Sequence, residues 1–130
     1  MATPRPIDLT VALGGLGFLP DRTPTTEDSS TDWAAQLASY RDGGIFAVHY
    51  AGQSEWERHG AGDEIVMVLE GATTMTMLVD GVEHELALGP MQLVVVPRGT
   101  WHRFVTPTGA KIVTVTPQPT DHRVEHPAAG

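Results

Sequence analysis

The stretch from residue 45 to residue 116 is a regular series of short segments that favour β-strands, separated by turn signals. Apolar and β-branched residues mark predicted strands at 45–50, 54–59, 64–69, 73–79, 82–88, 92–96, 102–105 and 111–116. Gly, Pro and Asp predict turns at 60–62, 70–71, 80–81, 89–90, 97–99 and 107–109. Asp80-Gly81, between two alternating segments, is the clearest hairpin signal. Short strands at this spacing predict an all-β sandwich or barrel.

The two ends of the chain lack this regular pattern. A length of 130 residues with 41% hydrophobic content suits one domain with one core. We expect an N-terminal arm at 1–30 with one short strand, a barrel domain at 31–117 and a C-terminal tail at 118–130. Because prolines and small residues dominate the tail, we predict an arm or a disordered end there.

A short helix is predicted over 33–40, just before the strands begin. Three large residues recur there at helical spacing, namely Trp33, Leu37 and Tyr40. Thr31 or Asp32 is a suitable N-cap, and two glycines at 43–44 would end the helix.

The overall composition excludes several kinds of partner and chemistry. With 16 acidic residues against 8 basic ones, the net charge is -8 and no basic cluster exists, so we expect no nucleic-acid or membrane partner. Because cysteine is absent, there is no disulfide, thiol nucleophile or zinc–thiolate cluster. The apolar run 11–19 lacks the basic segment that precedes a signal peptide. No apolar run reaches the roughly 18 residues of a membrane span, so we expect a cytoplasmic protein.

Two histidines and two carboxylates have a spacing that allows them to bind one metal ion. Glu57 and His59 are two residues apart, so on a strand their side chains point to the same face. Glu64 follows across a Gly-rich turn, and His102 begins another predicted strand. Asp63 competes with Glu64 for the ligand role, but strand alternation would turn it outward. Imidazole and carboxylate ligands suit divalent first-row metals.

These residues resemble the first signature motif of the cupin family, which runs roughly G-x5-H-x-H-x3,4-E-x6-G. His59, four residues, Glu64, six residues and Gly71 reproduce its second half. Glu57 stands where the family has the first histidine of the H-x-H pair. This replacement is the departure with the largest consequence for chemistry.

The second cupin motif, roughly G-x5-P-x-G-x2-H-x3-N, is matched at its centre. Pro97, Gly99 and His102 have the required spacing, and the whole resemblance covers about 44–116. Thr106 stands where the family has asparagine, and Gly89 is two residues out of register.

The resemblance implies a fold, a metal site and an assembly. The implied fold is the cupin double-stranded β-helix, a jelly-roll barrel, here with a short N-terminal helix and arm. The implied ligands of one divalent ion, manganese, iron, zinc or nickel, are Glu57, His59, Glu64 and His102. Small cupins of this kind commonly pair by exchanging an N-terminal strand, and 7–19 is apolar, so we expect a homodimer.

Two classes of function follow from the resemblance. The first is an enzyme in which the metal orients and polarises a small molecule, or binds dioxygen, as in many relatives. The second is a non-catalytic module that binds a small ligand with or without metal. Glu57 is the candidate catalytic residue, and it serves either as a metal ligand or as a general base.

The ligand pocket is less constrained by the sequence than the metal site. His49 and Tyr50 have opposite strand parity, so only one of them lines the interior, and the sequence leaves open which. Phe104 shares the face of His102 and is a candidate pocket wall. A lining of Met, Val, Leu and Phe with few positive charges favours a neutral or weakly polar ligand. Three further histidines are expected at the surface, His84, His122 and His126.

Overall fold

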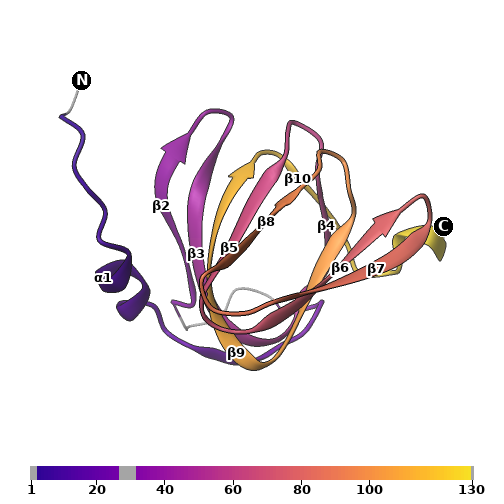
Figure 1. Cartoon of the computed structure of the whole chain (residues 1–130), viewed down its shortest axis with the longest axis horizontal. Coiled ribbons are helices and arrows are strands. Elements are labelled where there is room, and N and C mark those ends of the chain that lie inside the picture. Colours follow the sequence, from indigo (N-terminus) through magenta and orange to yellow (C-terminus); the bar gives the residue numbers. More distant parts are fainter. Residues whose placement is uncertain (1–2, 27–31, 130) are drawn as a thin grey trace.

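The computed structural model describes residues 3–26 and 32–129. These residues contain ten strands and two short helical segments (Figure 1). The first elements in chain order are α1 (Leu9–Gly14), β1 (Leu19–Arg22), β2 (Ala34–Tyr40), β3 (Gly43–Gln53), β4 (Trp56–His59) and β5 (Glu64–Gly71). They are followed by β6 (Thr73–Val79), β7 (Val82–Leu88), β8 (Gln92–Val96), β9 (His102–Pro117), β10 (Thr120–Arg123) and a 3₁₀ turn at Pro127–Ala129. The expectation of an all-β chain is therefore confirmed.

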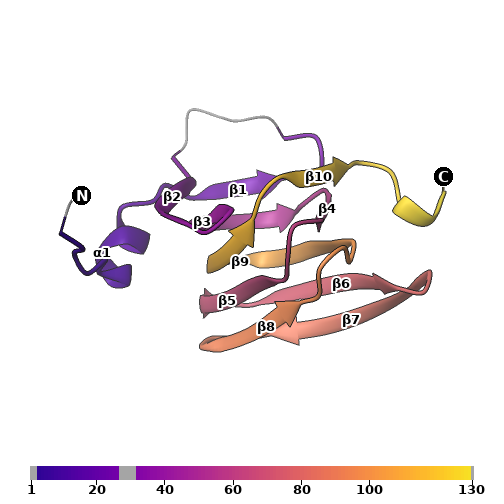
Figure 2. The same ribbon diagram turned by 90° about the horizontal axis from the view of Figure 1, so that it is seen from above.

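The strands form two walls that share the long strand β9. One wall has the order β2-β3-β9-β5-β8 and the other the order β10-β4-β9-β6-β7, with every pair antiparallel. Strand β1 adds in parallel to the end of β3. Figure 2 shows the walls from above, with β1, β3 and β10 on one side and β7 and β8 on the other. This is a jelly-roll arrangement whose strand order, within the described residues, does not close on itself.

The hairpin prediction at residues 80–81 is confirmed. Strands β6 and β7 pair up to Val79 opposite Val82. Asp80 and Gly81 have φ angles of 52° and 76°, so both lie in the left-handed region that a two-residue hairpin of this type requires. Aspartate and glycine are among the residues that tolerate this conformation best.

The turn predicted at 107–109 is wrong, because these residues lie inside β9. The first part of β9 pairs with β6, and the part after Gly109 pairs with β3 and β5. Gly109 has a φ of 100°, which lets the strand curve from one wall into the other without ending. Pro107 and Gly109 therefore mark a bend within β9 and not a turn that reverses the chain direction.

The helix predicted over 33–40 is also wrong. All of these residues except Trp33 form β2, which pairs with β3 from Ala34 opposite Val48 to Tyr40 opposite Gly43. Backbone hydrogen bonds to a neighbouring strand override the weak helical spacing of the side chains. The short helix lies earlier, at α1, where Asp8 caps the N-terminus by accepting from the backbone N–H of Val11. Thr31, one of the two proposed caps, lies outside the described residues.

The C-terminal tail contains a strand, contrary to the prediction of an arm or a disordered end. Residues of β10 pair with β4 in register, with Thr120 opposite His59 and His122 opposite Glu57. The tail thus covers the open edge of the strand that carries two of the predicted site residues. A four-residue polar segment gives no strand signal by itself, since its partner strand supplies the pairing.

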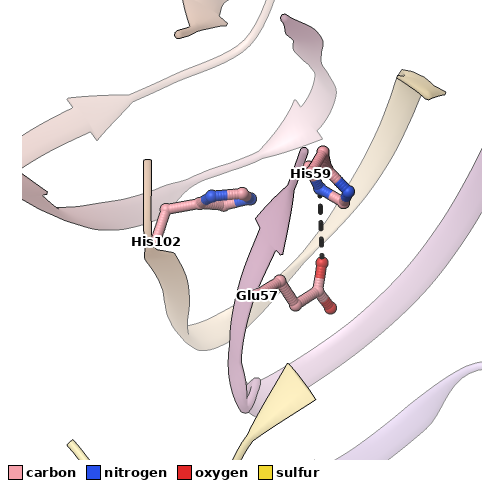
Figure 3. Close-up of side chains that lie close together, drawn as sticks. All are labelled: Glu57, His59 and His102. Atoms are coloured by element: carbon pink, nitrogen blue, oxygen red, sulfur yellow. Dashed lines mark ion pairs between the residues drawn. The ribbon is translucent and has the colours of Figure 1, made fainter. Parts of the chain in front are cut away.

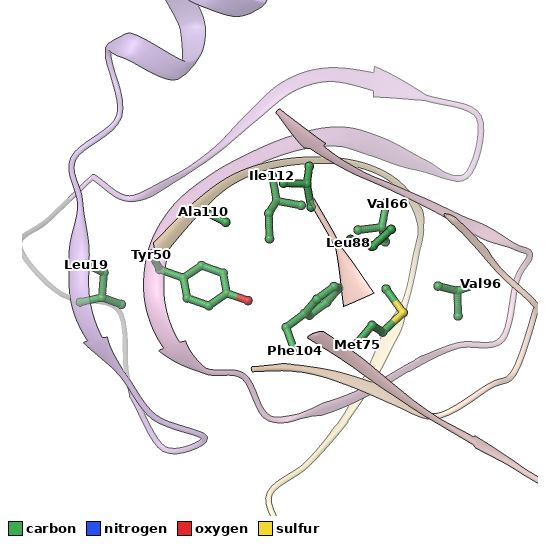
Figure 4. Close-up of a cluster of buried hydrophobic side chains, with 10 residues drawn as sticks. Leu19, Tyr50, Val66, Met75, Leu88, Val96, Phe104, Ala110 and Ile112 are labelled. Carbon is green, nitrogen blue, oxygen red and sulfur yellow. The ribbon is translucent and has the colours of Figure 1, made fainter. Parts of the chain in front are cut away.

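The hydrophobic core lies between the two walls (Figure 4). Its buried members are Leu19, Tyr50, Val66, Val68, Met75, Leu88, Val96, Phe104, Ala110 and Ile112. A second, smaller cluster lies where α1 packs outside the first wall, with Leu13 against Ala47 and Val113. Packing within both clusters fixes the positions of the strands that carry the candidate site.

Candidate metal centre and ligand cavity

Three strand ends bring the four predicted ligand residues together, and we call this set (Glu57, His59, Glu64 and His102) the candidate metal centre. Strand β4 carries Glu57 and His59 on one face, β5 begins with Glu64, and β9 begins with His102. Glu57 lies directly opposite His102 across the β4–β9 pair. Figure 3 shows Glu57, His59 and His102 as neighbouring side chains on these strands.

The distances within the candidate metal centre are short. Glu64 lies between the two histidines, with His59 Nε2 at 3.3 Å from its Oε2 and His102 Nε2 at 3.0 Å from its Oε1. His59 Nε2 is 4.0 Å from Glu57 Oε2. One ligand atom each of Glu57, His59 and His102 lies within 4.8 Å of the other two. The histidines and Glu64 are buried, whereas 18% of the Glu57 side chain is exposed.

Outer hydrogen bonds orient both imidazole rings. His102 Nδ1 lies 2.9 Å from the carbonyl oxygen of Thr100, which can only accept, so Nδ1 carries the proton. His59 Nδ1 lies 2.9 Å from Thr120 Oγ1, whose hydroxyl donates to Gln118 Oε1 at 3.1 Å. Since a hydroxyl has one proton, His59 Nδ1 donates to Thr120. Both Nε2 atoms therefore present lone pairs to Glu64, as in histidines that bind metals.

Glu64 is held by a similar outer contact. The hydroxyl of Thr116 donates to Glu64 Oε2 at 2.6 Å, and Thr114 Oγ1 lies 2.7 Å from Thr116 Oγ1. Glu64 Oε1 and the Nε2 atoms of both histidines are buried and have no hydrogen-bond partner within the described part of the chain. Acceptors that converge without a donor require a cation or a proton between them. The donor set of two imidazoles and two carboxylates fits a divalent metal ion.

The charges of the candidate metal centre shift its pKa values in different directions. Burial alone would raise the pKa of Glu64, but its contacts with His102 and His59 outweigh this and lower it to about 2. Burial opposes protonation of His102, yet the Glu64 carboxylate raises its pKa above the usual 6.5. Burial and the nearby Glu64 charge raise the pKa of Glu57. Glu64 is thus the fixed anion, and Glu57 is the carboxyl that holds a proton more readily.

A cavity of about 540 Å³ opens beside the candidate metal centre, and Glu57, His59 and Glu64 form part of its wall. Tyr50 lines this cavity, which settles the choice left open by strand parity, whereas His49 packs outside against Phe18. Phe104 forms part of the wall, as expected. This volume suits a small organic molecule.

Several side chains at the site were missed by the sequence analysis. Thr120 lies in the predicted tail, and Arg22 lies in the predicted arm, yet both line the cavity. Arg22 brings a positive charge into a pocket that we expected to be nearly free of such charges. His122 is exposed, as expected, but it also lines the cavity and contacts Glu55 at 2.7 Å. The terminal segments carried no motif, and only their pairing with β3 and β4 places them here.

The remaining polar candidates lie outside the candidate metal centre. Asp63 is turned outward, as strand alternation predicts, and accepts from the backbone N–H of Arg98 at 2.7 Å. His84 is exposed on β7. His126 contacts Glu83 at 2.8 Å and packs edge-on against Trp56.

Comparison with known proteins identifies relatives over most of the strand region. The family model that matches is described as a cupin domain and covers residues 44–126. Over 60 residues the chain is 42% identical to acireductone dioxygenases from two strains of Rhodopseudomonas palustris. This match covers 46% of the present chain but only 36% of each relative, so the chain spans about a third of their length.

Solved structures match the fold over a larger share of the chain. A cupin-2 domain protein from Shewanella frigidimarina has 18% identity and a TM-score of 0.60, with 90% of this chain and 94% of that chain covered. A hydroquinone 1,2-dioxygenase solved with Cd²⁺ and 4-hydroxybenzonitrile has 16% identity and a TM-score of 0.56, covering 65% and 63%. At these identities the likeness shows the fold alone. Within the described residues, no helix has the length and apolar character that crossing a membrane requires.

Proposed function

Since this chain belongs to the cupin family, we propose that it is a metal-dependent enzyme that acts on a small organic molecule in the cavity. The proposed ligands of one divalent ion are the four residues of the candidate metal centre. The observation that carries this proposal is the convergence of His59 Nε2, His102 Nε2 and Glu64 Oε1, all buried and without a donor in the described chain. The partial relatives are named as dioxygenases, which supports an enzyme over a binding module.

The ion would act as a Lewis acid that polarises an oxygen-bearing group of the substrate. The protein contributes orientation and charge. Thr100 and Thr120 hold the imidazole rings so that both Nε2 atoms face the same point, and Thr116 fixes Glu64. Glu57 is the most exposed residue of this set, and it lines the cavity together with His59 and Glu64. If Glu57 is instead not a ligand, its carboxylate stands beside an ion held by the other three residues, where it is suited to take a proton from a bound molecule as a general base.

Glu57 in place of a histidine also changes the charge of the proposed site. Two carboxylates and two neutral imidazoles around a divalent ion give a formal charge of zero, whereas three histidines and one carboxylate give +1. A neutral site is a weaker Lewis acid and attracts an anion less strongly. The additional oxygen ligand favours manganese, iron or magnesium over copper or nickel.

The proposal is tested by elemental analysis of protein purified without chelator, followed by a turnover screen of metal-loaded and chelated samples. We expect stoichiometric metal in the wild type, none in His102→Ala, and a full complement in His84→Ala, which removes an exposed histidine. Turnover should require the metal. Metal bound without any turnover would favour the non-catalytic binding module, and metal retained by His102→Ala would exclude the proposed ligand set.

We also propose that two chains associate. Strand β8 is an edge strand that exposes Met91 before it, at 80%, and Leu93 and Val95 along it, at 58% and 49%. Exposed apolar edges of this kind favour association. Light scattering at micromolar concentration should give twice the 13.9 kDa of one chain, and the mass of a monomer would contradict the proposal.

A further inference from the structure

Three side chains at one side of the cavity form a cluster that we call the donor corner (Arg22, Trp33 and Tyr50). The guanidinium carbon of Arg22 lies 4.9 Å from the ring centroid of Trp33 and 4.5 Å from that of Tyr50. The two rings meet edge to face at 5.8 Å. All three residues line the same cavity as Glu57.

The donors of this corner lack acceptors. Trp33 Nε1 and Tyr50 Oη are buried and make no hydrogen bond of good geometry in the described part of the chain, and the nearest polar side chains to the Tyr50 hydroxyl are Thr106 and Arg22. Among the described residues, no carboxylate lies within ion-pair distance of Arg22. Tyr50 is 1% exposed, and burial raises its pKa above 10, so its hydroxyl keeps the proton. Buried donors without acceptors are costly unless a ligand supplies the acceptors.

The backbone places Arg22 at the cavity through a close strand contact. Strand β1 runs parallel to the end of β3, with Arg22 opposite Gly52. Gly52 has a φ of 119°, and a Cβ at this position would collide with the carbonyl oxygen of Arg22. Only glycine allows this approach. The donor corner is therefore built by the fold, and Arg22 is not a loose surface side chain.

The two sides of the cavity carry opposite requirements. The candidate metal centre presents carboxylate and imidazole acceptors, whereas the donor corner presents a guanidinium, an indole N–H and a phenol O–H. A carboxylate group matches the donor corner, because guanidinium and carboxylate form paired, charge-assisted hydrogen bonds. A phosphate fits less well, since one guanidinium would face a double negative charge near Glu57 and Glu64.

We propose that the donor corner binds the carboxylate of a small organic acid whose other end faces the candidate metal centre. This proposal rests on the proposed function and deepens it by naming the substrate class. It also replaces our expectation of a neutral ligand, which did not include Arg22. Trp33, Tyr50 and Phe104 provide aromatic walls for the apolar part of the acid.

The test uses pairs of probes that have the same shape and differ in charge. These are acetate and acetamide, benzoate and benzamide, and 4-hydroxybenzoate and 4-hydroxybenzamide, with dissociation constants measured by calorimetry or NMR titration. We expect at least one acid to bind about tenfold more tightly than its amide, as charge-assisted hydrogen bonds imply. Equal affinities within all three pairs would overturn the proposal.

Three variants test whether the preference for acids over amides depends on the donor corner. Arg22→Gln should abolish the difference between acid and amide, and Tyr50→Phe should weaken acid binding while the ring remains. Arg41→Gln removes an exposed arginine that stacks on Tyr40 away from this cavity, so it should leave the preference unchanged. If Arg22→Gln does not fold, Tyr50→Phe decides the matter. A preference that survives Arg22→Gln, or survives Tyr50→Phe undiminished, would overturn the assignment.

Failure of this proposal can be told apart from failure of the proposed function. Metal content and turnover are measured on the same protein samples. A preference for acids that depends on Arg22 in a protein without metal or turnover would support the donor corner and refute the enzyme. Metal and turnover without any effect of Arg22 on acid binding would refute the donor corner alone.

Discussion

The candidate metal centre and the donor corner lie on the same cavity but are built from different parts of the chain. The metal centre uses the starts of β5 and β9 and the strand β4 between β9 and β10. The donor corner uses β1, the residue before β2, and β3. One region lacks donors and the other lacks acceptors. On the two proposals above, the central strands would set the chemistry, and the N-terminal strands would select the molecule on which it acts.

The largest effect is expected when both histidines of the metal centre are removed. His59→Ala combined with His102→Ala deletes both Nε2 ligands and should abolish metal binding. The wild type should lose stability on chelation, by about 2.7 kcal/mol if metal is present at a hundred times its Kd. Thermal melts of both proteins with and without chelator provide the measurement.

The double variant should show no change on chelation. Its binding of acids at the donor corner should persist in the same titrations, because Arg22 and Tyr50 are untouched. If the double variant retained metal at full stoichiometry, these histidines would not be the metal ligands, and the contrast between the metal centre and the donor corner would be wrong.

Glu57→Gln tests the residue that separates this chain from its family. The substitution keeps the size of the side chain and removes its charge. If Glu57 is a ligand, metal affinity should fall markedly; if it is a general base, metal should remain and turnover should fall by about 10²- to 10⁴-fold. Metal content and kcat are measured together on one preparation.

Glu85→Gln provides a matched control at an exposed glutamate of β7 that lines no part of the cavity. It should leave metal content and turnover unchanged. If Glu57→Gln also changes neither quantity, Glu57 has a structural role and the case for an enzyme loses its strongest support from the sequence.

Thr120→Val tests whether the C-terminal strand supports the metal centre. The variant removes the hydroxyl that accepts from His59 Nδ1 while keeping the shape of the side chain. Outer contacts of this kind typically contribute 10- to 100-fold to metal affinity, so we expect a loss in about that range. Thr108→Val, at an exposed threonine outside the cavity, should have no effect on a competition titration with a chelating dye. Equal affinities in the two variants would contradict the role of β10.

The candidate metal centre could be predicted from the sequence, whereas the donor corner could not. His59, Glu64 and His102 belong to spaced motifs, and local strand parity places Glu57 beside them, so the candidate metal centre follows from short stretches of chain. The donor corner depends on the pairing of β1 with β3 across many residues, which no local pattern encodes. The helix wrongly predicted at 33–40 has the same cause, because the partner strand β3 decides the conformation there.

The smallest expected effect is on stability in acid, and it belongs to the metal centre alone. In metal-free protein the pKa of Glu64 is lowered from 4.5 to about 2, so its ionised form stabilises the fold. This stability is fully present above 4.5 and is lost as the pH falls from 4.5 to about 2. Glu57 acts in the opposite direction, since its raised pKa means that its protonation favours the folded state.

Urea denaturation of chelated wild type and Glu64→Gln across this pH range isolates the contribution of Glu64. The difference in unfolding free energy between the two proteins should shrink as the pH falls, because the wild type loses its ionised carboxylate and the variant has none to lose. Tyr50→Phe should show no such change against the wild type, because Tyr50 stays protonated throughout this range. A difference between wild type and Glu64→Gln that is independent of pH would mean that Glu64 is not the fixed anion of the site. The two regions would then no longer differ in their response to protons.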